Sequence, residues 1–126
     1  MKTAIVSCVG PIDGLGAQLC VRIAKEGLYV LVAGRTQSKL DAVADLIKDQ
    51  GGSAEAVVAD ATDEVATKER FARAGDNLDL AIYNTGNNTP GRIIDMDADF
   101  FANRWRVCCL VDFCLVAKRC ASLLQP

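Results

Sequence analysis

The chain has 126 residues, of which 51% are hydrophobic, and its formal net charge is −2. This length allows one domain with a modest core, and this hydrophobic fraction excludes a disordered chain. The weak negative charge provides no overall attraction to nucleic acid or to anionic membranes. The absence of histidine removes the commonest general base and metal ligand.

Cysteine usage and apolar runs indicate the cellular setting. No two of the six cysteines form a CxxC pair, so we expect ordinary buried thiols and no metal site. The start of the chain reaches a glycine turn too early for a secretory signal. The longest apolar stretch, residues 107–117, contains Asp112 and is too short to span a bilayer. These features predict a cytoplasmic protein with reduced thiols.

Short apolar runs alternate with helical stripes along the chain, and glycines mark several boundaries. Ser38 is a candidate cap for the second helix, and Gly27 and Gly51 are candidate stops for the first and second. The predicted strands cover residues 3–9, 28–33, 54–60 and 78–84. The predicted helices cover residues 15–26, 38–50, 63–74 and 97–124, the third being the weakest.

Four strand–helix alternations in one domain, residues 1–126, predict a doubly wound parallel sheet of the Rossmann type with helices on both faces. Ligands of such sheets bind beyond the carboxyl ends of the strands. Three glycines lie at the end of the first strand. We expect Gly10 to allow a sharp turn, Gly14 to allow backbone to approach an anion, and Gly16 to allow close packing. The helix that follows offers N–H groups suited to a pyrophosphate.

The spacing Gly10-x-x-x-Gly14-x-Gly16 resembles the TGxxxGxG loop of the short-chain dehydrogenase/reductase family, with Val9 in place of threonine. The stretches "VAGRT", "ADATD" and "YNTG" fit the same family in the same order. The resemblance covers residues 1 to about 120 and implies that Asp60 lies beside adenine. The cofactor-binding residues that it implies are Gly10, Ile12, Asp13, Gly14, Leu15, Gly16, Arg35, Thr36, Asp60, Ala61, Asn84, Thr85 and Gly86.

The end of the second strand bears on the choice of cofactor. NAD-dependent enzymes usually carry an acidic residue there for the ribose hydroxyl, but this chain has Gly34 followed by Arg35. A guanidinium could hold a 2′-phosphate, with Lys39 as a helper. The sequence therefore favours NADP(H) over NAD(H); the alternative is a solvated loop arginine.

The family's catalytic pair is a tyrosine with a lysine four residues later. Here Tyr29 is followed at that distance by Ala33, and Tyr83 by Asn87. We expect the chain to be the cofactor-binding half, inactive alone, of an oxidoreductase that transfers hydride between a nicotinamide cofactor and a carbonyl or alcohol. The alternative is a non-catalytic nucleotide-binding or interaction module.

The long helix over residues 97–124 resembles the family's fourth helix. A family asparagine would fall near Cys108, which cannot replace its amide hydrogen bonds. The resemblance implies a homo-oligomer contact through this helix; burial under other parts of the domain is the alternative. We interpret Asp95, Asp97 and Asp99 as charges that favour the helix start and not as a cation site.

Overall fold

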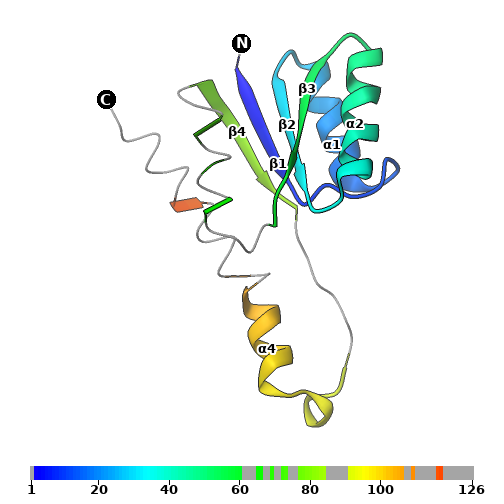
Figure 1. Ribbon diagram of the computed structural model, residues 1–126. Coiled ribbons are helices and arrows are strands. Elements are labelled where there is room, and N and C mark those ends of the chain that lie inside the picture. The colour runs from blue at the N-terminus through cyan, green and yellow to red at the C-terminus, as the bar shows by residue number, and fades with distance from the viewer. Residues whose placement is uncertain are drawn as a thin grey trace.

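The computed structural model describes residues 2–60, 65–66, 69, 72–73, 77–84, 91–106, 109 and 116–117. Strands and helices alternate in the order expected for a doubly wound domain (Figure 1). The elements are β1 (Thr3–Ser7), α1 (Leu15–Lys25), β2 (Tyr29–Gly34), α2 (Gln37–Asp49), β3 (Ser53–Val58), β4 (Leu78–Tyr83), the short 3₁₀ helix η2 (Ile93–Asp95) and α4 (Ala98–Trp105).

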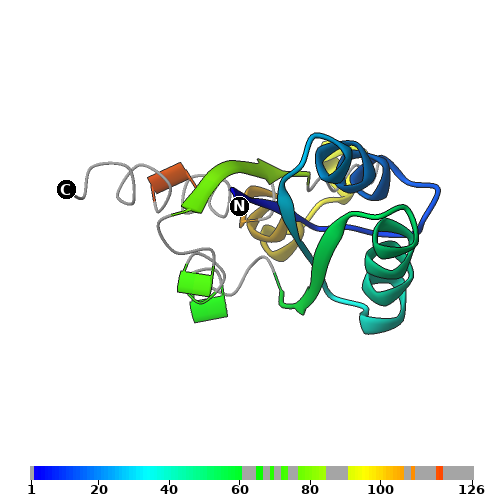
Figure 2. The same ribbon diagram turned by 90° about the horizontal axis from the view of Figure 1, so that it is seen from above.

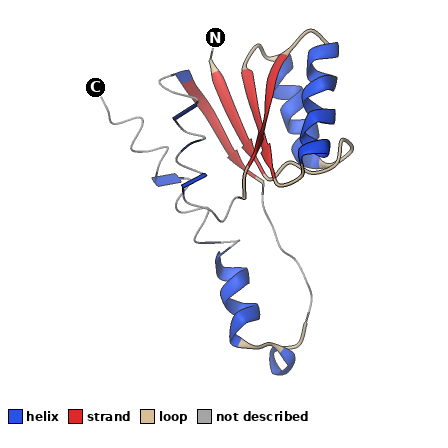
Figure 3. Cartoon of the chain, viewed as in Figure 1, coloured by secondary structure: helices blue, strands red, loops and turns tan. Residues whose placement is uncertain are grey.

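All four strands are parallel and lie in the order β3-β2-β1-β4 (Figure 3). Thr3 of β1 pairs with Tyr29 on one side and with Leu78 on the other. The register with β4 then shifts, because Ala4 pairs with Leu80 and Asp79 is left out of the ladder. The parallel sheet predicted from the alternation of elements is therefore confirmed, and its carboxyl edge gathers the loops that follow the strands.

The two faces of the sheet bury separate apolar clusters. Helices α1 and α2 lie side by side on one face (Figures 1 and 2), where Val6, Val32 and Leu40 are completely or almost completely buried. The other face contributes a smaller buried cluster that includes Ile5 and Leu31. Burial on both faces explains why the two central strands, β1 and β2, read as continuous apolar runs. The helix predicted at residues 63–74 falls mostly outside the described residues.

The ends of α1 and α2 follow the predicted glycine signals, but the start of α2 does not follow the predicted cap. Gly27 and Gly51 have φ angles of +90° and +83°, which glycine adopts without steric cost. The N-cap of α2 is Thr36, without a side-chain cap bond. Ser38 was the expected cap; it lies inside the first turn because the helix begins at Gln37.

Most of the predicted helix 97–124 beyond Arg106 lies outside the described residues. Its first part forms α4, which stands away from the sheet in Figure 1 and has no buried residue. The Asp97 carboxylate caps it by accepting a bond from the Phe100 N–H at 2.8 Å. Asp95 pairs with Arg92 at 2.8 Å. These contacts support the interpretation of both aspartates as structural charges. Among the described residues, no helix is long and apolar enough to cross a membrane.

The cysteines differ in environment. Cys20 is buried in α1, and burial raises the pKa of its thiol to about 12. Cys8 is partly exposed and Cys109 is exposed. The expectation of buried thiols is therefore wrong for Cys109, which follows the exposed helix α4. The other three cysteines, Cys108, Cys114 and Cys120, lie outside the described residues.

Candidate cofactor-binding site

The amino terminus of α1 points its backbone N–H groups toward the carboxyl edge of the sheet. Gly14 is the N-cap, with φ −79° and ψ 166°, and no side chain caps the helix. The first turn contains no acidic residue. Within the described part of the chain, the N–H groups of Leu15 and Gly16 therefore have no side-chain cap. Such a helix start attracts anions through both its donors and its dipole.

The loop before α1 is held by two local hydrogen bonds. The Gly14 N–H donates to the Pro11 carbonyl at 2.9 Å. The Gln18 side-chain amide donates to the Ile12 carbonyl at 3.0 Å. Ile12 and Asp13 remain exposed. The loop is thus shaped by backbone contacts, and its outer surface is open to a ligand.

Gly16 brings α1 close to the ends of β1 and β4. A Cβ atom at this position would lie 3.3 Å from the Val9 Cα atom and 3.0 Å from the Asn84 Nδ2 atom. Asn84 directly follows β4, and its N–H donates to the Ser7 carbonyl at 3.4 Å. The close packing expected of Gly16 is confirmed, and it places Asn84 beside the start of α1.

The sharp turn after β1 is made by Cys8 and not by Gly10. Cys8 has a φ angle of +63°, whereas Gly10 is not in the left-handed region and a Cβ atom on it would contact nothing within 4 Å. The Val9 N–H then donates to the Ala33 carbonyl at 2.9 Å, which returns the chain to the sheet. The role expected for Gly10 was wrong because β1 ends at Ser7, two residues before the predicted boundary.

Gly34 packs against the backbone of the same loop. A Cβ atom on Gly34 would lie 2.7 Å from the Val9 carbonyl oxygen and 2.9 Å from the Leu40 Cδ2 atom. Any side chain at this position requires the backbone or Leu40 to move. Arg35 and Thr36 follow at once and are exposed. The end of β2 therefore has no room for a carboxylate side chain at residue 34, and the next residue, Arg35, exposes its guanidinium to solvent.

The structure gathers most of the predicted site residues at one edge. Asp60 lies exposed just beyond β3. The residue before it, Ala59, continues the pairing with β2, because its N–H donates to the Gly34 carbonyl at 2.8 Å. Ala61, Thr85 and Gly86 lie outside the described residues. The predicted residues that the structure brings to the carboxyl edge are Gly10, Ile12, Asp13, Gly14, Leu15, Gly16, Arg35, Thr36, Asp60 and Asn84.

The two tyrosines lie at opposite edges of the sheet. Tyr29 begins β2 at the amino edge and donates a hydrogen bond to Glu55 at 3.2 Å. Burial, together with the Glu55 charge, raises the Tyr29 pKa. A phenol at the amino edge with a raised pKa is unsuited to proton transfer at neutral pH. Tyr83 ends β4 at the carboxyl edge and pairs with Ser7.

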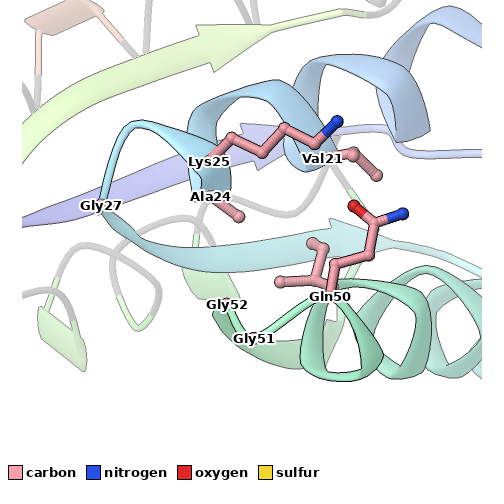
Figure 4. Close-up of a pocket in the computed structure, with 8 residues that line it drawn as sticks. Val21, Ala24, Lys25, Gly27, Gln50, Gly51 and Gly52 are labelled. Atoms are coloured by element: carbon pink, nitrogen blue, oxygen red, sulfur yellow. The ribbon is translucent and has the colours of Figure 1, made fainter.

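A hollow of about 340 Å³ lies far from this edge, between the carboxyl-terminal ends of α1 and α2 (Figure 4). Lys25 and Gln50 form its polar side, and Val21, Ala24 and Ile47 contribute apolar surface. A Cβ atom on Gly52 would lie 2.8 Å from the Ile47 Cγ2 atom and 3.2 Å from the Ala24 Cβ atom, so Gly52 allows the two helices to meet. The hollow is a consequence of this helix contact and contains none of the predicted site residues.

The comparison with protein families agrees with this geometry. Residues 2–117 match the family model described as short chain dehydrogenase. The chain therefore belongs to the short-chain dehydrogenase/reductase family.

Curated relatives support this assignment. An uncharacterised oxidoreductase of Mycobacterium tuberculosis is 34% identical over 108 residues, which are 80% of this chain and 40% of that protein. A 3beta-hydroxysteroid dehydrogenase of Mediterraneibacter gnavus is 32% identical over 85 residues, or 65% of this chain and 31% of that protein.

Solved structures of the family share the fold. A short-chain dehydrogenase/reductase from Serratia marcescens superimposes with a TM-score of 0.86 at 26% identity, covering 96% of this chain and 50% of that one. A putative short-chain dehydrogenase/reductase from Burkholderia xenovorans gives a TM-score of 0.81 at 27% identity, covering 93% and 49%. The chain thus spans about half the length of these structures and less than half of the curated relatives.

Proposed function

We propose that this chain binds NADP(H) at the carboxyl edge of its sheet and supplies the cofactor-binding part of an oxidoreductase acting on a carbonyl or alcohol. The observation that carries the proposal is the start of α1, which has no side-chain cap and where Gly16 packs beside Asn84. The pyrophosphate would accept bonds from the N–H groups of this first turn. When bound, such a cofactor supplies hydride transfer at the nicotinamide.

The preference for NADP(H) rests on the end of β2. Gly34 has no room for the acidic side chain that holds the ribose of NAD, since its Cβ position is 2.7 Å from the Val9 carbonyl oxygen. The exposed Arg35 follows it, and a guanidinium forms charge-assisted bonds with a phosphate. Asp60, at the end of β3, would lie beside the adenine.

The test is calorimetric titration of the purified chain with NADPH and NADH, for the parent and for Arg35→Ala. We expect the parent to bind NADPH more tightly. We expect the variant to lose about 1–3 kcal/mol of NADPH binding and much less of NADH binding. Lys48→Ala, in the last turn of α2 and so at the end of the helix away from the candidate site, is the matched control for a general loss of positive charge and should have little effect. Equal weakening of both nucleotides by Arg35→Ala would remove Arg35 from the phosphate site.

A second candidate function is a nucleotide-binding module without catalysis. The positions of the tyrosines favour it, because neither is followed by lysine four residues later and Tyr29 lies at the amino edge. NADPH oxidation by the chain with a panel of aldehydes and ketones tests this second candidate. Turnover by the chain alone, abolished by Gly14→Val, would contradict the second.

We place the protein in the cytoplasm and propose that it forms homo-oligomers through the helix that begins with α4. The exposed Phe101 and Trp105, 70% and 49% accessible, support an apolar contact on this helix. Sedimentation of the parent and of Phe101→Asp tests this contact. If the parent is a dimer, Phe101→Asp should sediment as a monomer, and a variant with the same mass as the dimeric parent would contradict the contact.

A further inference from the structure

The order of the strands fixes the direction in which a dinucleotide would cross the site. The start of α1 lies over the middle of the sheet, after β1. Arg35 follows β2 and Asp60 follows β3, so the proposed sites for the 2′-phosphate and the adenine lie on one side of it. The remaining strand on the other side is β4. The nicotinamide end of the ligand must therefore extend across the end of β4.

Tyr83 is the last residue of that strand. It pairs with Ser7, the last residue of β1, and the next residue, Asn84, packs against Gly16 at the start of α1. Successive side chains of a strand point to opposite faces. Ile82 packs against the cluster under α1 and α2, so the Tyr83 ring lies on the other face, with Ser7. Tyr83 is partly exposed, whereas Ser7 is fully buried.

We infer that the Tyr83 ring forms the wall of the site that contacts the nicotinamide ring, an inference that rests on the proposed function. Aromatic rings in contact stabilise one another by offset stacking or edge-to-face packing. Nicotinamide is a flat aromatic group, and the phenol offers it an apolar face with a polar tip. Tyr83 is thus a positioning residue for the reactive end of the cofactor, distinct from the residues that hold the phosphates.

Two ligands separate contact with nicotinamide from support of the fold. NADPH carries the nicotinamide, and adenosine 2′,5′-bisphosphate carries only the adenine end with its 2′-phosphate. Tyr83→Leu removes the ring and keeps an apolar side chain. It should weaken NADPH binding about two- to tenfold and leave the affinity for the bisphosphate unchanged. Tyr83→Phe keeps the ring and should bind both ligands as the parent does.

Four outcomes would overturn the inference. Equal weakening of both ligands by Tyr83→Leu would assign Tyr83 to the fold, and thermal melting of the variants gives the independent measure of that role. Unchanged NADPH binding by Tyr83→Leu would exclude the contact. A parent chain that binds neither ligand would overturn the proposed function, and this inference with it; a parent that binds the bisphosphate as tightly as NADPH would overturn this inference alone.

Discussion

At the scale of single residues, Cys8 has a strained backbone conformation that its neighbours do not have. Its φ angle of +63° is left-handed, and for a residue with a Cβ atom that conformation costs roughly 1–2 kcal/mol. The surrounding contacts maintain it, because the adjoining Val9 N–H is bonded to the Ala33 carbonyl. The strain therefore lies at the point where the chain leaves the sheet for the candidate site.

Replacing Cys8 with glycine should therefore stabilise the protein. Relief of the left-handed strain is partly offset by the greater entropy of glycine in the unfolded chain, roughly 0.4–1 kcal/mol. We expect a net gain of about 0.5–1 kcal/mol in the free energy of unfolding, measured by urea denaturation. Cys8→Ala is the control, since it removes the thiol and keeps the strain. An alanine variant as stable as the glycine variant would contradict this account.

Gly34 should be among the glycines that tolerate replacement least. A Cβ atom there meets the Val9 carbonyl oxygen at 2.7 Å, and an overpacked site of this kind costs about 1–3 kcal/mol. Gly34→Ala should lower the free energy of unfolding by that amount. Gly10→Ala lies in the same region and meets nothing within 4 Å, so it should be nearly neutral. Equal stability of the two variants in denaturant titration would show that β2 and the loop can separate at little cost.

At the scale of elements, the start of α1 is the feature on which the candidate site depends. A branched side chain at Gly14 would stand over the N–H groups of the first turn and meet the Pro11 carbonyl, which lies 3.1 Å from the Cβ position. We expect Gly14→Val to abolish NADP(H) binding and Gly14→Ala to weaken it to a smaller degree, as measured by calorimetry. Circular dichroism establishes that each variant is folded. A folded valine variant that binds as tightly as the parent would show that the ligand does not approach this loop.

The type of each described strand and of α1 and α2 was predictable from sequence, because their apolar periodicities differ and glycines follow both helices. The local conformations at their ends were not. Nothing in the identity of Cys8 indicates a left-handed backbone, which tertiary contacts impose. In the same way, Thr36, Gln37 and Ser38 are consecutive polar residues, so the sequence does not determine which of them is the N-cap of α2. The observed cap, Thr36, lies two positions before the predicted one. The crowding at Gly34 depends on Val9, 25 positions earlier in the sequence, and only the folded sheet brings the two together.

At the scale of the whole molecule, the sheet has two edge strands that differ in protection. The edge strand β3 carries Glu55 at its centre, and this carboxylate is bonded to Arg73 at 2.7 Å. The other edge strand, β4, carries only Asp79, which lies at its start and pairs with Lys2 at 3.6 Å. Charges along an edge discourage pairing with another chain. Within the described part of the chain, β4 is therefore the more exposed template for strand addition.

We predict that the isolated chain self-associates through β4. The strand contains no proline, and Leu80 is 38% exposed near its middle. Leu80→Lys places a charge on this edge and should lower the average mass measured by light scattering at a given concentration. Val58→Lys is the matched control, because Val58 is 49% exposed and ends the opposite edge strand β3. If the parent is a monodisperse monomer, the β4 edge is not an association site. If Leu80→Lys and Val58→Lys reduce the mass equally, the added charge itself, and not its location on β4, determines association.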